Sequence, residues 1–191
     1  MIQVTFPDGT IREYEKGTSA LQIAMSISEG LARNVLAARV NGQVKDAVLP
    51  INENCELQLL TWNDTDGKST MWHSSAHLMA EALELLYPGT KFGIGPSIET
   101  GFYYDVDFGD HKLEGDELEQ IENKMIELAK LKSEFVRKDI SKTAAVSYFQ
   151  EKGDEYKLDL LEGLEDGTIT FYEQGNFTDL CRGPHIPNTG F

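Results

Sequence analysis

Three of the four histidines and one of the two cysteines of this 191-residue chain fall into two short motifs. The stretch "WHSSAHLMAEALELLYP" places His73 and His77 four residues apart, and "DLCRGPH" places Cys181 and His185 at the same spacing. Cysteine and histidine bind transition metals, and histidine also moves protons near neutral pH. The two half-motifs therefore predict that their four side chains meet at one site.

The segment that carries the first motif has the pattern of a helix. Four residues turn a helix by roughly 400°, so His73 and His77 project from the same side, one turn apart. At roughly 100° per residue, the apolar residues gather in a stripe almost opposite the histidines, and these are Leu78, Met79, Ala82, Leu85 and Leu86. We therefore expect histidines that lie off the core face, with space beside them at the small Ala80.

The spacing of the motifs leaves more than one chemistry open. A zincin protease needs HExxH with a glutamate as base, and the residues between these histidines are Ser-Ser-Ala, so that reading is excluded. The four side chains could instead close a tetrahedral zinc site, structural or catalytic. They could equally orient a water molecule and an ester without a metal. His111, in an acidic turn, is expected to be an ordinary surface residue.

Residues 1–62 have the pattern of a small β-grasp (ubiquitin-like) domain. "IQVTFPDG" alternates apolar residues up to a Pro-Asp-Gly turn, and "TIREYEKG" returns as a second strand. A helix follows with Thr18 or Ser19 as N-cap, and its predicted apolar face comprises Leu21, Ala24, Met25 and Ile27. Asn41-Gly42 predicts a hairpin. "CELQLLT" closes the sheet, with Cys55 as an apolar, half-buried residue.

Residues 63–191 form the second predicted domain, after a polar linker "NDTDGKST" at 63–70. Short strands and a tight loop at 93–96 are expected in "KFGIGPSIETGFYYDVDF". A long helix is predicted from apolar residues three and four apart, namely Leu118, Ile121, Met125, Leu128, Leu131 and Phe135. A further helix is expected from Ser141 to about Lys152. Strands are expected at Leu158–Leu161 and in "TITFYE", before a loop that begins at Asn176.

Composition and charge restrict the function classes. The chain is 40% hydrophobic and 26% charged, as soluble globular proteins are. No apolar run approaches the roughly 18 residues of a membrane span, and since "MIQVTFPDGT" does not have the basic and then apolar profile of a secretion signal, none is expected. Two dissimilar cysteines argue against a disulfide framework, so a reducing cytoplasm is the expected location.

The net charge of −15 is unevenly distributed. Residues 1–62 carry five Lys and Arg against seven Asp and Glu, and residues 63–191 carry twelve against twenty-five. Because an acidic surface repels a polyanion, and extended non-specific nucleic-acid binding normally comes with an excess of Lys and Arg, any broad grip on a nucleic acid is expected to be supplied elsewhere. Contact with a nucleic acid should be confined to a terminus or a single nucleotide in a pocket.

Several stretches together resemble a known family. "HSSAH", "GIGPSIETGFYYDVD", "EYKLDLL" and "DLCRGPH", in this order behind a β-grasp domain, closely resemble the N-terminal half of bacterial threonyl-tRNA synthetases. The resemblance covers essentially the whole chain. It implies a TGS domain at 1–62 and an editing domain at 63–191, as in the second additional domain of threonyl- and alanyl-tRNA synthetases. The fold class is therefore α+β, with a mainly antiparallel sheet and packed helices in the second domain.

The resemblance implies an activity, which is post-transfer editing. Threonine and serine differ by one methyl group, which a pocket discriminates by only about 1–3 kcal/mol, so serine escapes selection at the charging step. A second site then hydrolyses Ser-tRNA(Thr). Because no residues follow Phe191, we expect the class II catalytic core and the anticodon-binding domain to be absent from this chain. This expectation also accounts for the charge, since those domains would hold the tRNA body.

The motif positions carry implied catalytic roles. His73 is the first choice to contact the ribose hydroxyl or the leaving oxygen of the ester, and His77 completes the HxxxH motif. Lys157, in "EYKLDLL", could place the attacking water or stabilise charge on the carbonyl oxygen. Cys181 and His185 are expected to position water and to form the pocket wall. Cys181 is not expected to act as a covalent nucleophile.

The resemblance also implies substrate-binding residues. Asp179 could bind the serine ammonium group. Tyr104 and the loop with Gly93, Gly95 and Pro96 could hold the adenosine, since glycine lets a ligand approach the backbone closely.

Partners and cofactors follow from the same resemblance. The expected partners are the 3′ aminoacyl-adenosine end of tRNA(Thr) and the rest of the synthetase. The chain alone is expected to be monomeric, and the full-length protein a homodimer. No cofactor is expected here, because ATP, magnesium and the zinc of the aminoacylation site belong to the missing catalytic domain. If zinc were bound, His73, His77, Cys181 and His185 would hold it, and the competing hypothesis is a non-catalytic tRNA- or protein-binding module with such a structural zinc.

Overall fold

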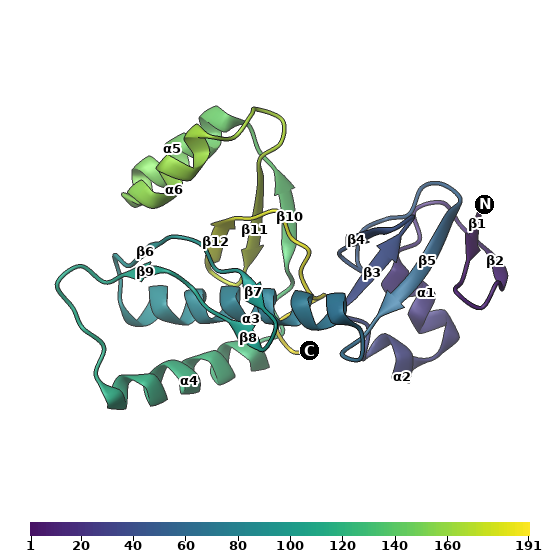
Figure 1. Ribbon diagram of the computed structural model, residues 1–191, viewed down its shortest axis with the longest axis horizontal. Coiled ribbons are helices and arrows are strands. Elements are labelled where there is room, and N and C mark those ends of the chain that lie inside the picture. The colour runs from purple at the N-terminus through teal and green to yellow at the C-terminus, as the bar shows by residue number, and fades with distance from the viewer. The chain divides into compact units, whose positions relative to one another are not determined.

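A computed structural model describes the whole chain, residues 1–191, and divides it into two compact units. The first unit comprises residues 1–71, 183–187 and Phe191. The second comprises residues 72–182 and 188–190. Figure 1 labels the helices and strands of each unit.

The first unit is built on a five-stranded sheet in the order β2-β1-β5-β3-β4. Its strands are β1 (Ile2–Thr5), β2 (Ile11–Tyr14), β3 (Ala37–Val40), β4 (Gln43–Lys45) and β5 (Cys55–Leu60). β1 and β5 pair in parallel, and the other neighbours are antiparallel. The helices α1 (Ala20–Ile27) and α2 (Glu29–Ala32) lie between β2 and β3 in the chain. This element order is the predicted β-grasp fold.

Local sequence signals set the bounds of these elements. Ser19 is the N-cap of α1, with its hydroxyl accepting the Gln22 N–H in a capping box. At the β3–β4 hairpin, Asn41 and Gly42 have φ of 49° and 81°, as a two-residue turn of matching twist requires. Cys55 is only 6% exposed, so it is a core residue, and burial raises the pKa of its thiol.

The predicted apolar face of α1 was partly wrong. Met25 and Ile27 are 53% and 40% exposed, whereas Leu21 packs at the edge of the core. Ala20, Ile23 and Ala24 form the buried face instead. These three residues also follow spacings of three and four. The helical periodicity was therefore predicted correctly, but the predicted buried face was rotated from the actual one and shares only Ala24 with it.

The second unit is carried by four helices. They are α3 (Thr65–Leu86), α4 (Gly115–Lys130), α5 (Lys142–Lys152) and α6 (Glu155–Glu162). α3 begins at Thr65, so the prediction of a polar linker at 63–70 was wrong. The Asp64 carboxylate accepts the Thr61 N–H, and the Asp64 carbonyl accepts the Lys68 N–H, so the polar residues start the helix. The domain boundary at residue 62 stays a prediction, since the compact units divide between residues 71 and 72.

Short antiparallel strands complete the second unit. β6 (Lys91–Phe92) pairs with β9 (Val106–Asp107), and β7 (Ser97–Ile98) pairs with β8 (Gly101–Phe102). A three-stranded sheet has the order β10-β11-β12, with β10 (Val136–Asp139), β11 (Thr170–Gln174) and β12 (Phe177–Leu180). The mainly antiparallel character is as predicted.

Two predicted elements were wrong in kind. The strand expected at Leu158–Leu161 is part of α6, because Asp154 caps this helix and its Oδ1 accepts the Lys157 N–H. The loop expected from Asn176 begins instead with strand β12, since the turn at 175–176 returns the chain onto β11. The predicted helix at 141–152 is confirmed, with Ser141 as N-cap and Gly153 as C-cap at φ +70°.

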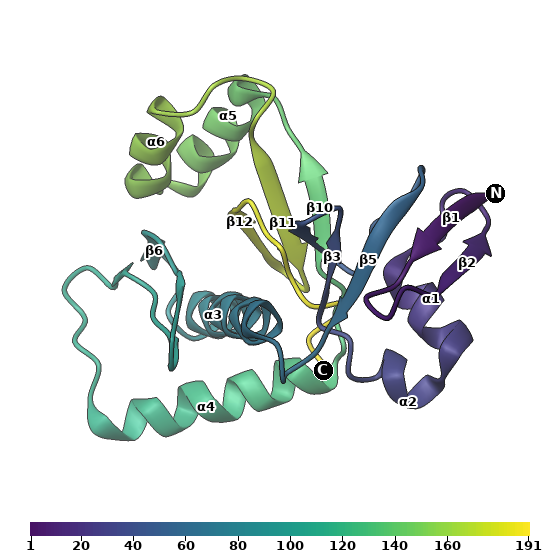
Figure 2. The same ribbon diagram turned by 45° about the vertical axis from the view of Figure 1, so that its right-hand side comes forward.

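The second unit has two apolar clusters. One joins α3 and α4 to β6 and β12 through Ala80, Ile121, Phe92 and Phe177, among others. The other packs α5 and α6 onto β11 through Phe149, Leu161 and Phe171, among others. Figure 2 shows α3 nearly end-on, between α4 and the β10–β12 sheet. The histidine helix is therefore covered on two sides within its own unit.

The predicted stripes on both long helices were partly wrong. Ala82 on α3 and Ile121 and Leu128 on α4 are buried as predicted. On α3, Leu85 is 43% exposed, whereas Ala76 and Ala80 are fully buried, so Ala80 fills the core and leaves no space. On α4, Leu118 and Leu131 are 56% and 65% exposed. Phe135 is buried as predicted, but it lies beyond the end of α4.

None of the six helices combines the length and the apolarity that crossing a membrane would require.

Candidate active site

Helix α3 presents His73 and His77 on one side, as the four-residue spacing predicts. Their ring centroids are 5.2 Å apart and the rings are perpendicular. His73 is half-buried, but His77 is only 2% exposed. The expectation that both histidines lie off the core was therefore wrong for His77.

Aromatic rings and a carboxylate surround His77. The rings of Phe177 and Phe135 lie in T-shaped contact with its ring, with centroid distances of 6.0 and 6.5 Å. Burial lowers the pKa of His77 to about 3, and the nearby Asp179 carboxylate only partly opposes this. His77 is therefore a neutral imidazole at pH 7, whose Nε2 lies 3.6 Å from Asp179 Oδ2.

Cys181 meets the first motif across 108 positions of the chain. Its Sγ lies 3.3 Å from His73 Nε2. Cys181 directly follows β12, and its N–H and carbonyl both bond to Thr170 at the start of β11. The β11–β12 hairpin thus carries the thiol to the helix, and the predicted meeting of the HxxxH motif with Cys181 is present.

Lys157 and Asp179 form a buried ion pair beside His77. Lys157 Nζ lies 2.6 Å from Asp179 Oδ1, and both side chains are under 5% exposed. Lys157 Nζ also donates to the Tyr104 hydroxyl at 3.2 Å, and that hydroxyl donates to Asp179 Oδ2. A charge-assisted network of this kind is strong in a buried setting.

The network shifts the pKa values of Asp179 and Tyr104. Burial alone would raise the pKa of Asp179, but the Lys157 ammonium, aided by the hydrogen bonds to the carboxylate, holds it below the usual value. Burial and the Asp179 charge raise the pKa of Tyr104 well above its usual value. Asp179 is thus an anion and Tyr104 a neutral donor at pH 7.

Local structure explains why Lys157 is in this place. Asp154 caps α6 and its second oxygen accepts the Phe92 N–H at 3.1 Å, which ties the start of α6 to strand β6. Lys157 lies in the first turn of α6 and is directed inward, with 2% exposure. The Asp154 cap therefore fixes the start of α6 and, with it, the position of the Lys157 ammonium group inside the unit.

The glycines at 93–96 have a packing role inside the unit. A Cβ on Gly95 would lie 2.4 Å from the Tyr104 ring, so only glycine fits beneath that ring. Gly93 lies against Asp105, to which it is hydrogen-bonded. The Pro96 carbonyl accepts the Tyr103 N–H at 3.5 Å. Contact of this loop with adenosine stays a prediction.

His185 belongs to residues 183–187, which are grouped with the first unit. It is 1% exposed, and its N–H donates to the Asp46 carboxylate at 2.6 Å. Its role beside the other motif residues stays a prediction. His111 is a surface residue as predicted, paired with Glu117 at 2.8 Å and with its side chain 43% exposed.

The donors of His73, His77 and Cys181 are of the kind that bind zinc. Their ligand atoms lie within 4.8 Å of one another. Tetrahedral zinc, with bonds of about 2.0–2.3 Å, would hold such atoms roughly 3.5 Å apart. The residues therefore fit zinc chemically after a small contraction, and His185 is the fourth donor that the motifs offer.

Sequence reasoning missed two buried polar residues next to His77. Glu81 and Gln174 are 2% and 1% exposed. Gln174 Nε2 donates to the His77 carbonyl at 3.0 Å. Glu81 continues the four-residue spacing of His73 and His77, and that repeat was the signal that could have identified it.

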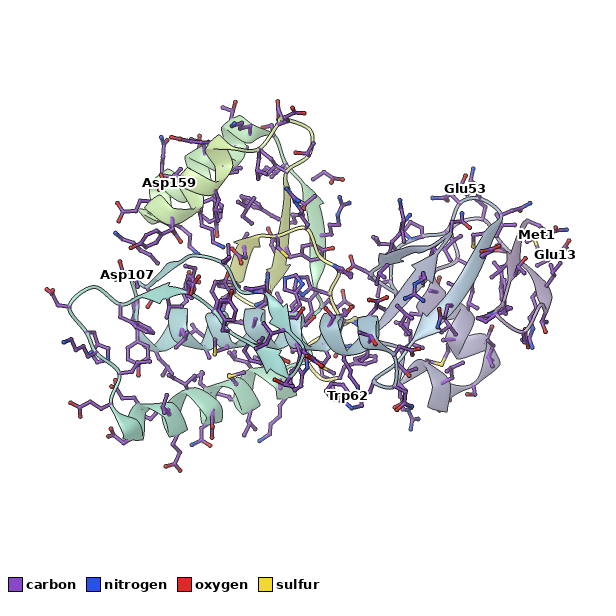
Figure 3. All side chains as sticks on the ribbon, viewed as in Figure 1. Met1, Glu13, Glu53, Trp62, Asp107 and Asp159 are labelled. Carbon is purple, nitrogen blue, oxygen red and sulfur yellow. The ribbon has the colours of Figure 1, made fainter.

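Acidic side chains on the surfaces of both units account for the negative charge. Figure 3 labels Glu13 and Glu53 on the first unit and Asp107 and Asp159 on the second. The cationic Lys157, by contrast, is buried within the network.

Comparison with known proteins supports both domain types. A TGS domain matches residues 2–61, and the threonyl and alanyl tRNA synthetase second additional domain matches residues 169–191. The latter match includes Gln174, Asp179 and Cys181.

Threonine--tRNA ligases of several bacteria match this chain over its whole length. The chain is 70% identical over all its 191 residues to threonine--tRNA ligase of Cytophaga hutchinsonii, 59% to that of Parabacteroides distasonis and 58% to that of Porphyromonas gingivalis. It spans only about 30% of the length of these curated relatives. The chain is thus similar throughout its length to the N-terminal region of threonine--tRNA ligases, with their TGS and second additional domains.

Proposed function

We propose that this chain is the editing part of a threonine--tRNA ligase and that its second unit hydrolyses the ester of mischarged Ser-tRNA(Thr). One observation carries the proposal. A contiguous set of proton-transferring and charged groups, from Cys181 and His73 through His77 to Asp179 and Lys157, lies in a chain 70% identical to a threonine--tRNA ligase. Ester hydrolysis needs groups of these kinds around water and a carbonyl.

The proposed roles follow the accessibility of each group. His73 is half-buried and contacts Cys181, so it is the group placed to meet the ribose hydroxyl or the leaving oxygen. Lys157 would orient the attacking water or stabilise charge on the carbonyl oxygen. The neutral His77 would serve as an uncharged hydrogen-bonding neighbour. Cys181 and His185 would position water without a covalent step.

Asp179 would have two roles, namely to position Lys157 and to bind the serine ammonium group. It already accepts from Lys157, Tyr104 and the Leu180 N–H, so its first duty is to hold the lysine. Binding the serine ammonium would require the substrate to share this carboxylate with Lys157. Tyr104 and the loop at 93–96 would contact the adenosine.

The ligation of threonine to tRNA(Thr) would belong to the part of the relatives that this chain does not span. That part would also bind ATP, magnesium and the zinc of the aminoacylation site, grip the tRNA body and form the dimer. The editing site would then need to recognise only the aminoacyl-adenosine end, which suits an acidic surface.

The test is deacylation of two substrates by the chain. Ser-tRNA(Thr) should lose its amino acid at least about 10-fold faster than Thr-tRNA(Thr), because the extra methyl must be refused by the pocket. Hydrolysis of Ser-tRNA(Thr) at the spontaneous rate, with the chain in excess, would refute the proposal.

Removal of metal distinguishes metal-free hydrolysis by an oriented water molecule from the alternative, a binding module with a structural zinc site. We propose that zinc is not required, because Lys157 already supplies a positive charge next to Asp179. Treatment with a chelator should leave the deacylation rate within about two-fold, whereas loss of a Lewis acid would cost several kcal/mol. Stoichiometric zinc whose removal unfolds the second unit would favour the competing binding module.

A further inference from the structure

Glu81 is a buried carboxyl that the proposed chemistry does not use. It lies two turns beyond His73 on α3 and one turn beyond His77, and it is 2% exposed. A buried carboxyl without a charged partner is costly, so its position calls for specific contacts.

The contacts of Glu81 are to the turn of the β11–β12 hairpin. Its Oε1 accepts the Asn176 N–H at 3.1 Å. The preceding Gly175 has φ +51°, and a Cβ there would lie 2.1 Å from the same oxygen. The turn therefore sits directly on the carboxyl, and only glycine permits this approach.

A second contact joins the same hairpin to the same helix. Gln174, the last residue of β11, donates through Nε2 to the His77 carbonyl at 3.0 Å. Gln174 Oε1 and Glu81 Oε2 are both buried acceptors without a hydrogen-bond donor. Burial raises the pKa of Glu81, and the hydrogen bond from the Asn176 N–H partly opposes this.

The β11–β12 hairpin, which Glu81 and Gln174 join to α3, leads to two residues of the candidate site. Asp179 is on β12 and Cys181 directly follows it, whereas His73 and His77 are on α3. A shift of the hairpin along the helix would change the 3.6 Å approach of Asp179 to His77 and the 3.3 Å approach of Cys181 to His73.

We propose that Glu81 is a positioning residue, which clamps the turn at 175–176 onto α3 and thereby sets Asp179 and Cys181 opposite the histidines. The inference rests on the proposed hydrolysis for its catalytic consequence. The contact between Glu81 and the turn at 175–176 can be tested separately, without substrate.

The test compares Glu81→Met, which keeps the volume and removes the acceptor, with Glu81→Gln, which keeps an oxygen for the Asn176 N–H. Glu81→Met should lower kcat for Ser-tRNA(Thr) by about 10- to 100-fold with KM nearly unchanged, because small misplacements are costly to chemistry. Glu81→Gln should retain activity. Glu84→Ala, which removes a carboxylate of α3 that pairs with Lys152, is the control and should also retain it.

Hydrogen exchange of the Asn176 amide tests the clamp independently. The amide should be protected in the wild type and in Glu81→Gln, and unprotected in folded Glu81→Met.

If Glu81→Met does not fold, a second variant replaces it. Gly175→Ala, which pushes the turn off the carboxyl, should give the same exposure of the Asn176 amide and the same loss of kcat. An unprotected amide in the wild type, or full kcat in a variant with an unprotected amide, would overturn the inference. If the wild type protects the amide but does not hydrolyse Ser-tRNA(Thr), the proposed function fails while the clamp stands.

Discussion

Lys157→Met should destabilise the chain by about 3–5 kcal/mol and remove measurable deacylation, because it leaves the Asp179 carboxylate buried without its cation. Lys157 Nζ and Asp179 Oδ1 are 2.6 Å apart, and both side chains are under 5% exposed. The loss should appear as a lower midpoint of urea unfolding followed by circular dichroism, with the slope unchanged.

Two further variants make this result specific. Lys138→Met removes a lysine of the same unit whose ion pair with Glu173 is exposed, and it should cost at most about 1 kcal/mol. The double variant Lys157→Met/Asp179→Asn removes both buried charges, so it should recover much of the stability and none of the activity. A Lys157→Met protein as stable as Lys138→Met would contradict the buried ion pair.

The double variant His73→Ala/His77→Ala should lower the single-turnover rate of Ser-tRNA(Thr) hydrolysis by about 10²- to 10⁴-fold, the range of general acid–base catalysis. His73 should account for most of the loss in activity, because it is the more exposed and contacts Cys181. His77 should account for most of the loss in stability, because it is buried among Phe177 and Phe135.

His111→Ala is the matched control for the histidine variants. Its ring lies at the surface and pairs with Glu117, so its removal should leave the rate unchanged. The role assignment would be wrong if the double variant, shown to be folded by circular dichroism, kept the wild-type rate.

The common direction of His73 and His77 could be predicted from their spacing, because a four-residue repeat on a helix fixes a common direction regardless of packing. Their approach to Cys181 was predicted from the residue types alone, and the contact of Cys181 with His73 agrees with it. The Asn-Gly hairpin was likewise a local signal with one structural solution, whereas the helix cap was narrowed only to Thr18 or Ser19, of which Ser19 is the cap. The resemblance to threonyl-tRNA synthetases supplied Lys157 and Asp179, which the sequence pattern alone would have left as a surface lysine and a loop carboxylate.

The burial of His77 could not be predicted from one helix. Its surroundings come from Phe177 and Phe135, which are distant in the chain and enter through tertiary packing. Helix α6 was missed because a short apolar run resembles a strand, whereas Asp154 caps a helix there. The position of Glu81 could have been identified from the four-residue repeat, but its contacts could not, because the turn at 175–176 reaches it only through tertiary packing.

The crystal structure of the chain with a non-hydrolysable amide analogue of seryl-adenosine would show directly whether the substrate binds at the candidate site. We predict that the analogue's carbonyl and ribose lie within hydrogen-bonding distance of His73 and Lys157, with its seryl group beside Asp179. An analogue bound elsewhere, with these side chains untouched, would contradict the account.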